Sequence, residues 1–548
     1  MSSKNEDHCR HALLLPDVRK WLLLRIALRI IQGMAPSTAS PAAALESDVC
    51  YLAMKAHDAR FDGSFFTGVT STGVYCRPVC RVKLPRRENC RFFQHAAQAE
   101  AAGFRPCLRC RPELAPRAAS WSTEDASRIL ALQAARLIDE PDAWAEDGPG
   151  AASIAARLGV SDRHLRRIFE AQFGVSPLQY LQTRRLLAAK QLIADTRLPM
   201  TQVALASGFA SVRRFNAAFV SHYGLNPSAL RRAGAAAGER GGGSVGVRLG
   251  YRPPYDAAAM LGFFARRALG GVEAIDDVGG TPRLARTLRV AQGERVHAGW
   301  LQLRFDGERG HLLLQVGDSL AAVLPTVISR VRAMLDLDAD PMAINLALHA
   351  SFPQGDGLRV PGTLDGFELA VRAVLGQQIT VAAARTLGTR LVQALGEPIA
   401  TPVAGLDRLF PTPAALAAAS GDALGRLGIV RQRQSALIAL ATQVLEGRLA
   451  LHAGADVPGT LAALQQLPGI GDWTAQYIAM RALRWPDAFP AGDVALQKAL
   501  RVSSARAAAE ASQAWRPWRS YAVLRAWHSP LPAGESAAAP PGHESVAA

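Results

Sequence analysis

The sequence predicts a multidomain protein that is mainly α-helical with α+β parts, and three observations support this fold class. The 548 residues exceed the length of one ordinary domain, so three or four domains are expected. Hydrophobic residues make up 49% of the chain, which is enough to bury several cores. A glycine-rich stretch at 234–246 separates two regions with different apolar spacing. Its composition predicts a flexible linker that lets the two halves move independently.

The domains follow one another along the chain. All seven cysteines lie in the first fifth of the sequence, where a small α+β domain is expected. Alternating apolar residues from Leu301 to Val316, with a turn at Asp306 and Gly307, indicate a hairpin within a second small α+β domain. The predicted boundaries are an extension at 1–45 that is either disordered or amphipathic, a cysteine-rich domain at 46–116, a helical domain at 120–233, the linker at 234–246, the second α+β domain at 247–326, an all-α domain at 327–530 and a disordered tail at 531–548.

The charge balance favours a polyanionic partner. The formal net charge is +16 and the isoelectric point is about 10.1, which favours nucleic acid over a membrane surface. The most apolar N-terminal run, 13–34, is interrupted by charged residues and does not read as a membrane span. An odd number of cysteines at one end suits a metal or thiol site in a reducing compartment. A cytoplasmic, nucleoid-associated protein is therefore expected.

Residues 154–233 contain an internal repeat. Each copy has a short apolar helix, a glycine turn and a serine, Ser161 or Ser211, that can cap the next helix. One such unit fits a plain helical bundle, but two in tandem with matching Gly-Pro exits resemble the DNA-binding domain of the AraC family. The resemblance implies an all-α double helix-turn-helix with a long joining helix near 178–194. The repeated apolar positions are Leu165, Phe169 and Phe173, then Phe215, Phe219 and Tyr223.

The two recognition helices are expected at 161–171 and 211–220. Arginine and asparagine side chains can read base edges in a major groove or hold phosphates, and the sequence leaves both roles open. Two such helices on one chain can read successive groove segments, so a palindromic dimer site is not required and a monomer is expected. The residues expected to contact DNA are Arg163, Arg166, Arg167, Arg213, Arg214 and Asn216.

Four cysteines have the spacing of a metal site. Cys76 and Cys80 form one pair, and Cys107 and Cys110 form another. Four thiolates with this spacing can hold one Zn²⁺ tetrahedrally, and the spacing by itself favours a closed structural site. Cys50 and Cys90 have the context of ordinary buried residues, and Cys9 lies in the extension.

The residues around these cysteines indicate a reactive site instead. The segments 61–66, 71–78 and 102–107 resemble the zinc-binding domain of the Ada alkylation-response family. The resemblance implies that Cys76 is both a ligand and the acceptor of a methyl group from a DNA methyl phosphotriester. A zinc-bound thiolate is nucleophilic at neutral pH, and its methylation makes the site one unit less negative, which favours contact with DNA. Because no cysteine follows Cys110, the second cysteine with which many Ada proteins repair O6-alkylguanine is absent.

A short hairpin motif lies between two helical runs of the second half. Pro468, Gly469 and Gly471 allow a tight turn whose backbone N–H groups can face a phosphate. This is the pattern of a helix-hairpin-helix, which holds DNA without reading its sequence. By itself it indicates DNA binding alone.

Together with the segments 253–263, 371–377, 487–493 and 515–521, the hairpin resembles the AlkA-type 3-methyladenine DNA glycosylases over about 247–530. The resemblance implies that Asp493 is the catalytic aspartate, although an aspartate at a helix start is by itself more often a cap. An N-alkylated purine carries a positive charge and leaves without a general acid. One carboxylate near the sugar then suffices to stabilise the oxocarbenium-like transition state.

The same resemblance implies which residues hold the extruded base, because electron-rich aromatic faces bind a cationic base. Trp473 replaces the Schiff-base lysine of related lyases and so indicates a monofunctional enzyme that leaves an abasic site. Gln378 and Val494 depart from one member of that family, which has a leucine wedge and a pocket tyrosine at these positions. The implied pocket residues are Trp473, Tyr477, Trp527 and Phe263, and the implied DNA contacts are Gly469, Gly471, Gln377 and Gln378.

Three functions fit these patterns: a combined sensor, activator and glycosylase, a transcriptional regulator with an inactive glycosylase domain, and a glycosylase that its N-terminal modules only target. Asp493 and its aromatic neighbours weigh against the second, and two intact helix-turn-helix units weigh against the third. The expected partners are double-stranded DNA, alkylated or promoter, and RNA polymerase, with no membrane. The expected cofactor is one Zn²⁺.

Overall fold

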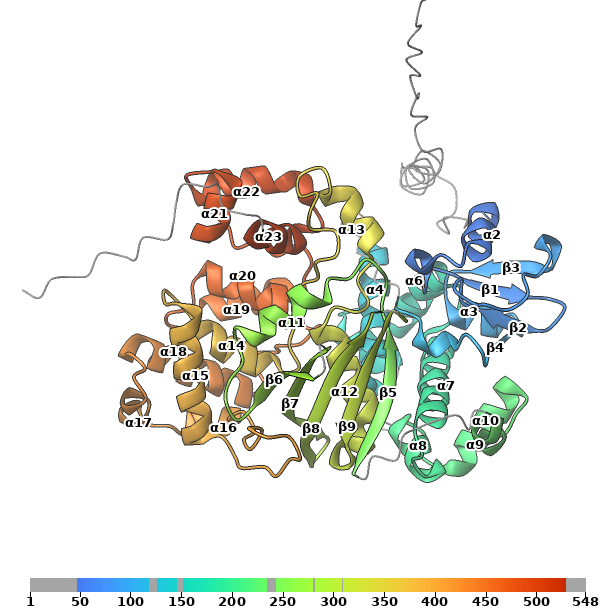
Figure 1. Ribbon diagram of the computed structural model, residues 1–548, viewed down its shortest axis with the longest axis horizontal. Helices are drawn as coiled ribbons and strands as arrows, with labels where there is room; N and C mark the ends of the chain where they lie inside the picture. The colour runs from blue at the N-terminus through green and yellow to red at the C-terminus, as the bar shows by residue number, and fades with distance from the viewer. Residues whose placement is uncertain are drawn as a thin grey trace, which may run out of the picture.

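The computed structural model describes residues 47–117, 126–144, 151–233, 243–278, 281–307 and 309–528 (Figure 1). The predicted extension at 1–45, the predicted tail at 531–548 and most of the predicted linker lie outside these residues. The described chain forms four groups of elements that follow one another in sequence order, from the small sheet at one side of Figure 1 to the helices at the other.

The first group is a small α+β domain. A four-stranded sheet packs with α2 (Ser47–Lys55) and α3 (Ala96–Ala101). Strand β1 is antiparallel to both of its neighbours, whereas β2 and β4 are parallel, so the ends of β2 and β4 lie side by side. The strand order across the sheet is β3 (Cys90–Phe93), β1 (Phe66–Val69), β2 (Val74–Cys76) and β4 (Arg105–Pro106).

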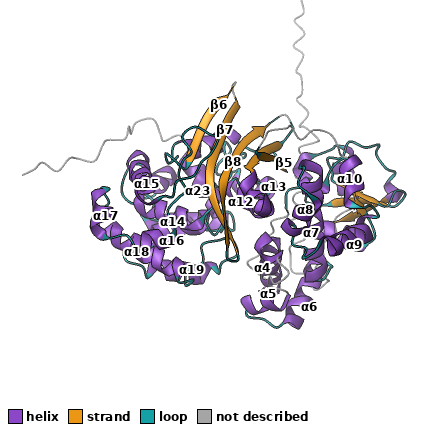
Figure 2. Cartoon of the chain, turned by 90° about the horizontal axis from the view of Figure 1, so that it is seen from below, coloured by secondary structure: helices purple, strands orange, loops and turns teal. Residues whose placement is uncertain are grey.

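The second group is all-α and contains the two predicted helix-turn-helix units. Ser161 and Ser211 each accept a hydrogen bond, at 3.2 Å, from the backbone N–H three residues later, which confirms the predicted caps. Figure 2 shows α4–α6 and α8–α10 as separate groups joined by α7. The helices are α4 (Ala126–Asp139), α5 (Ala151–Arg157), α6 (Asp162–Phe173), α7 (Pro177–Asp195), α8 (Met200–Ala206), α9 (Val212–Tyr223) and α10 (Pro227–Ala233).

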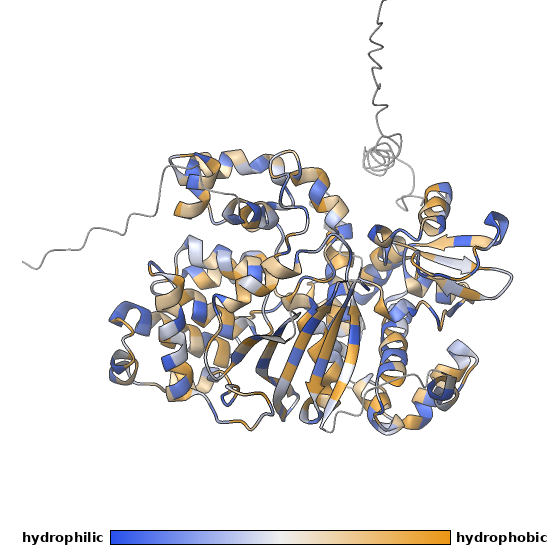
Figure 3. Ribbon diagram, viewed as in Figure 1, coloured by the Kyte–Doolittle hydropathy of each residue, from blue (hydrophilic) through white to orange (hydrophobic). Residues whose placement is uncertain are grey.

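The third group is a five-stranded antiparallel sheet with α11 (Ala257–Ala265) and α12 (Leu324–Met334). The predicted hairpin is confirmed as the β8–β9 pair, in which Asp306 lies opposite His311. Bands of apolar residues run along these strands in Figure 3, and Leu301, Leu303 and Leu312 are fully buried. The order is β5 (Ser244–Gly250), β9 (His311–Gly317), β8 (Arg295–Asp306), β7 (Thr281–Gln292) and β6 (Glu273–Val278).

Two features of this sheet differ from the prediction. Strand β5 begins at Ser244, so the last residues of the predicted linker at 234–246 belong to the sheet. The β6–β7 pair was not predicted, because its buried positions include Glu273, Arg286 and Thr287 in place of apolar residues. Glu273 and Arg286 form an ion pair of 3.0 Å inside the domain, which satisfies charges that the sequence alone would place on the surface.

The fourth group is all-α, and two apolar cores fill it. The predicted hairpin connects α19 to α20, with Gly469 at a φ of 76° and Gly471 capping the second helix. The helices are α13 (Pro341–Leu348), α14 (Gly366–Leu375), α15 (Val381–Leu395), α16 (Pro413–Ala417), α17 (Gly421–Arg426), α18 (Arg431–Leu445), α19 (Val457–Gln465), α20 (Asp472–Arg481), α21 (Val494–Leu500), α22 (Ala505–Ala511) and α23 (Arg519–His528).

The two halves of the chain pack against each other, so the prediction of independent halves is wrong for this structure. Gln191 of α7 donates a hydrogen bond of 2.9 Å to the carbonyl of Arg248 in β5, and Asp195 pairs with the Arg248 side chain at 3.2 Å. A flexible linker does not prevent docking when apolar surfaces on both sides can be buried together. The shared core contains Leu192, Val203 and Leu230 of the first half with Leu249, Leu320 and Val323 of the second.

Gly63 offers a test of the close packing around Pro116 within the cysteine domain. It has a φ of 74°, and a Cβ there would overlap the carbonyl oxygen of Pro116, whereas Gly73 has a φ of 65° with open space around it. We expect Gly73→Ala to cost about 1 kcal/mol for the left-handed backbone alone. Gly63→Ala should cost about 3 kcal/mol or more, because backbone must also move. Urea unfolding of the two full-length variants measures the difference, and equal costs would contradict the packing described here.

Candidate metal centre and nucleic-acid interfaces

The four cysteines predicted to bind metal are gathered at one site. Their sulfur atoms all lie within 4.8 Å of one another. Cys76 ends β2, and Cys107 follows β4 and donates its backbone N–H to the carbonyl of Tyr75 at 2.9 Å, so the parallel strand pair brings the two halves of the site together. Cys50 and Cys90 are buried elsewhere, as predicted.

The donor set fits zinc. Sulfur atoms about 2.3 Å from a tetrahedral Zn²⁺ are within about 4 Å of each other, which this cluster permits. Hydrogen bonds to Cys107, Cys76 and Cys80, with burial in addition, raise the pKa of the Cys110 thiol well above its ordinary value. A thiolate at Cys110 is therefore unfavourable without a cation, and a divalent ion removes that obstacle.

Cationic side chains surround this cluster. The backbone N–H of Arg77 donates to the Cys110 sulfur at 3.3 Å, and the Arg77 side chain donates to the Cys110 carbonyl at 3.0 Å. Lys190 of α7 is buried and pairs with Glu113 close to Cys107. Sequence reasoning did not identify Arg77 or Lys190 as part of the site, although Arg77 directly follows a ligand.

The predicted recognition helices present their polar side chains to solvent. Phe169 of α6 and Phe215 of α9 are fully buried on the opposite faces. In α6, Arg166 also pairs with Asp162 at 3.0 Å, and Arg167 contacts His164 at 3.1 Å. The predicted DNA contacts Arg163, Arg166, Arg167, Arg213, Arg214 and Asn216 are all exposed.

The end of α9 is connected to the cysteine domain. His222 lies 2.5 Å from Glu100 of α3, and the same carboxylate accepts hydrogen bonds from Thr183 of α7 at 2.6 Å and from Tyr75 of β2 at 2.8 Å. Burial lowers the pKa of His222, but the hydrogen bond and charge of Glu100 outweigh burial and raise it above its ordinary value. Three elements thus meet on one buried carboxylate.

The helix-hairpin-helix is braced by a residue predicted to contact DNA. The Gln377 amide donates to the carbonyl of Gly469 and to the hydroxyl of Thr474, both at 2.9 Å. Gln378 is exposed and has a φ of 55°, which is uncommon for a residue other than glycine. The structure therefore gives the adjacent glutamines different surroundings.

Asp493 lies between two indole rings at the start of α21. Its carboxylate accepts hydrogen bonds from Trp473 Nε1 at 2.8 Å and from Trp527 Nε1 at 3.1 Å. It also caps α21 by accepting from the backbone N–H of Leu496 at 2.7 Å. Three donors from three segments fix the orientation of this carboxylate, so both the capping role and the predicted site are present together.

Three of the four predicted pocket aromatics are close to Asp493. The Trp473 and Tyr477 rings stack with centroids 5.3 Å apart and an interplanar angle of 10°, and Trp527 is 6.5 Å from Tyr477. Phe263 is placed differently. Only 3% of it is exposed, and the guanidinium groups of Arg267 and Arg481 lie 3.8 and 4.7 Å from its centroid.

Sequence reasoning missed the two arginines beside the pocket. Arg481 donates to the Tyr477 hydroxyl at 2.5 Å. Burial raises the pKa of Tyr477, but Arg481 and Arg267 outweigh this effect and the pKa is lowered. Arg481 is four residues after Tyr477 in the same helix, so helical spacing could have identified this pair.

Comparison with known proteins agrees with this arrangement. Four family models match in order: the metal binding domain of Ada at 49–113, a helix-turn-helix domain at 154–233, the AlkA N-terminal domain at 246–365 and the HhH-GPD superfamily of base excision DNA repair proteins at 371–515. A probable bifunctional transcriptional activator/DNA repair enzyme AlkA of Mycobacterium tuberculosis is 39% identical over 87% of this chain and 95% of its own length. This chain belongs to that family.

Two further relatives each match one part of this chain. DNA-3-methyladenine glycosylase 2 of Escherichia coli is 36% identical over 51% of this chain and 96% of its own length. The regulatory protein ada of Salmonella typhimurium is 38% identical over 30% of this chain and 44% of its own length. The four-cysteine cluster is thus the zinc site of an Ada-type domain. Across the described residues, no helix combines the length and apolar character needed to cross a bilayer.

Removing one ligand tests the zinc site. We expect Cys80→Ala to lose the single bound zinc and to make the cysteine domain sensitive to protease, because metal binding and folding are linked in small zinc domains. Cys90→Ala is the matched control, since Cys90 is also a buried cysteine of the same domain but lies outside the cluster. Metal analysis and limited proteolysis of both proteins check this, and full zinc retention by Cys80→Ala would contradict it.

The His222–Glu100 contact predicts a pH dependence. A histidine whose pKa is raised by folding stabilises the native state fully below its unfolded pKa of about 6.5, and the contribution is lost as pH rises through the folded value. We therefore expect His222→Gln to destabilise the protein more at about pH 6 than at about pH 8.5. Urea unfolding at both pH values measures this, with His164→Gln on α6 as the control. A pH-independent cost would contradict the ion pair.

Proposed function

We propose that this chain senses DNA methylation damage at Cys76, activates transcription of repair genes, and excises alkylated purines such as 3-methyladenine. The observation that carries the excision activity is the Asp493 carboxylate, which two indole N–H groups hold beside stacked aromatic rings and close in sequence to a DNA-binding hairpin. The four-sulfur cluster that includes Cys76 supports the sensing activity.

The sensing step is a methyl transfer from DNA to sulfur. The Cys76 sulfur attacks the methyl carbon of a methyl phosphotriester, so that a C–S bond forms while the C–O bond breaks. The electron pair of the broken bond stays on the phosphate oxygen, and the DNA regains its ordinary phosphodiester charge. Bound Zn²⁺ supplies the thiolate form of the cysteine at neutral pH. Cys76 is consumed once, so the reaction is stoichiometric.

Methylation raises the affinity for DNA by changing charge. The thioether formed at Cys76 carries no negative charge, so repulsion between the site and backbone phosphates decreases. The arginines of α6 and α9 then hold the promoter, by phosphate contacts or base contacts. RNA polymerase would be recruited by the chain acting as a monomer, since both recognition helices are on one polypeptide. The reduced cysteines of the zinc site suit the cytoplasm.

The excision step needs one carboxylate and an aromatic pocket. A base extruded from the duplex would be held by Trp473, Tyr477 and Trp527, whose electron-rich faces attract a cationic purine. The Asp493 carboxylate stabilises positive charge on the sugar as the glycosidic bond breaks, and water completes the hydrolysis. Trp473 offers no amine for a Schiff base, so we propose a monofunctional glycosylase.

Two positions near this pocket differ from the family member with which the sequence was compared. Val494 is 66% exposed beside Asp493, and it can make only apolar contact with a base. Gln378 is exposed at the edge of the DNA-binding surface, where its amide could fill the emptied stack and also form hydrogen bonds. Both side chains bear on the range of bases removed, whereas the carboxylate chemistry at Asp493 does not depend on them.

The proposed function is tested first at Asp493. An Asn side chain can still cap α21 and accept from an indole, but it carries no charge, so Asp493→Asn should fold and lose activity. We expect release of 3-methyladenine from methylated duplex DNA to fall by about 10²–10³-fold or more. Asp472→Asn is the control, since Asp472 is an exposed aspartate at the start of α20. Absence of release by zinc-replete wild-type protein would leave a regulator with an inactive glycosylase domain.

A further inference from the structure

The residues on either side of Cys76 connect it to different parts of the molecule. Tyr75 reaches α7 and α9 through Glu100, as described above. Arg77 is 5% exposed, and its guanidinium pairs with Asp62 through a hydrogen bond of 2.8 Å. Its backbone N–H is bonded to the Cys110 sulfur. A change in the charge or position of the cluster sulfur atoms therefore acts directly on Arg77, the residue that holds Asp62.

Asp62 is in turn bonded to the second half of the chain. Its carbonyl accepts from Arg252 Nε at 2.7 Å, and Arg252 is 1% exposed. Other nitrogens of the same guanidinium donate to the carbonyls of Pro116 and Arg117, at 3.3 and 3.0 Å. On the opposite side they donate to the carbonyls of Asp338 and Ala339, at 2.8 and 3.1 Å. One buried cation thus joins the zinc domain to the segment 336–339.

This segment leads to the base pocket. Asp336 has a φ of 50° and accepts a hydrogen bond of 2.8 Å from the Tyr521 hydroxyl. Arg484, three residues after α20 ends, pairs with Asp336 at 3.4 Å. Tyr521 lies in the first turn of α23, the helix that also carries Trp527. The Trp527 indole in turn donates a hydrogen bond to Asp493. The contacts from Cys76 to Asp493 are therefore continuous through buried side chains and short backbone segments.

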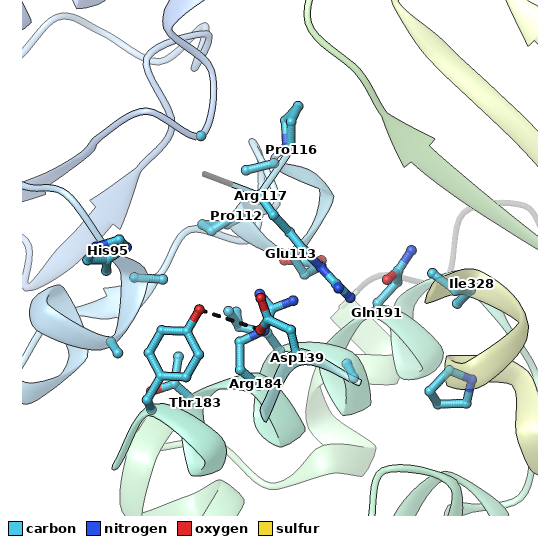
Figure 4. A pocket seen from close by; sticks show the side chains of 18 of the residues that line it. His95, Pro112, Glu113, Pro116, Arg117, Asp139, Thr183, Arg184, Gln191 and Ile328 are labelled. Atoms are coloured by element: carbon cyan, nitrogen blue, oxygen red, sulfur yellow. Dashed lines mark hydrogen bonds and ion pairs between the residues drawn. The ribbon is translucent and has the colours of Figure 1, made fainter. Parts of the chain in front are cut away.

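The junction also has room to rearrange. A cavity of about 100 Å³ lies between the zinc domain, α7 and α12, with Gly63, Arg117 and Arg332 in its wall. Figure 4 shows Arg117, Asp139 and Arg184 approaching one another there, and Asp139 pairs with Arg184 at 2.7 Å. Because the cavity leaves this wall incompletely packed, Arg117 can move there with fewer van der Waals contacts to break than in a filled core.

We propose that the methylation state of Cys76 is transmitted through Arg77, Asp62 and Arg252 to the segment 336–339, so that the zinc domain regulates base excision by the other half. This inference rests on the proposed function of both halves. Methylation weakens one ligand and removes one negative charge, so the cluster holds Arg77 less firmly. Asp62 and Arg252 then lose order, and α23 positions Trp527 and Asp493 less well.

The test compares full-length zinc-loaded protein before and after methylation of Cys76, verified by the mass gain of one methyl group. Hydrogen–deuterium exchange should become faster in peptides covering 336–339 and the start of α23. The rate of 3-methyladenine excision should fall by about fivefold, the lower end of typical coupling between distant sites. Unchanged exchange in these peptides after methylation would overturn the proposal, whatever the excision rate.

Variants identify the route. Arg252→Gln should abolish the response of segment 336–339 to methylation while the protein still binds one zinc. Arg248→Gln is the matched control, because Arg248 is in β5, four residues before Arg252 and at the same boundary, but its side chain is 48% exposed in its ion pair with Asp195, and this variant should retain the response. Asp62→Asn breaks the Arg77 pair and gives a second test if Arg252→Gln does not fold. A full response in both Arg252→Gln and Asp62→Asn would overturn the route.

The two proposals can fail separately. If Cys76 gains no methyl group from methylated DNA, the sensing function is contradicted. In that case the same cluster is perturbed by removing the zinc and adding it back, and the exchange measurement is repeated. A hydrogen–deuterium exchange rate in segment 336–339 that changes with zinc occupancy would support the connection between the cluster and this segment. An exchange rate that does not change with zinc occupancy would overturn it. If the protein excises no base, the exchange measurement still reports on the junction.

Discussion

The guanidinium of Arg252 is the contact on which the arrangement of the two halves depends. Burial of a cation costs several kcal/mol unless its donors are satisfied, and here all of the hydrogen-bond acceptors recorded for it are backbone carbonyls. Hydrogen bonds to a charged group contribute about 1.5–3 kcal/mol each. Since the carbonyls come from both halves, the arginine is satisfied only when the halves are docked. Gly250 adds a steric condition, because a side chain there would overlap the carbonyl oxygen of Leu114 in the first half.

Charge has a second role at the zinc site. The site is surrounded by Arg77, Lys190 and Arg111, all of them tied into ion pairs with Asp62, Glu113 and Asp195. Lys190 and Arg111 have carboxylate partners that do not depend on the charge of the cluster, whereas Arg77 also contacts a ligand sulfur through its backbone N–H. The loss of one negative charge therefore has two effects. Outside the protein it reduces the repulsion of DNA phosphates, and inside the protein it alters the hydrogen bond that the backbone N–H of Arg77 donates to a ligand sulfur. These are two different outputs of one chemical event.

The sequence identifies features whose information is local. The zinc ligands follow from two short cysteine pairs, the caps of α6 and α9 from single serines, and Asp493 from a motif around it. It does not reveal Arg252, because an isolated arginine is expected on the surface and its acceptors are 86 to 190 residues away. The β6–β7 pair was missed for a related reason, since the Glu273–Arg286 pair occupies buried positions. Phe263 was assigned to the pocket by resemblance, yet two arginines lie over its ring.

Joining these activities in one chain has a consequence that neither half has alone. Under the proposed function, Cys76 reacts once whereas Asp493 is regenerated after each excision, so a molecule that has been methylated still carries its excision residues. Methylated molecules accumulate on promoters, and unmethylated ones remain available to damaged DNA. If the junction through Arg252 makes the methylated form a poorer glycosylase, methylated molecules serve mainly in transcription and unmethylated molecules mainly in base excision. An excision enzyme held at a promoter would otherwise act on a small part of the genome, so little excision is lost by slowing it there.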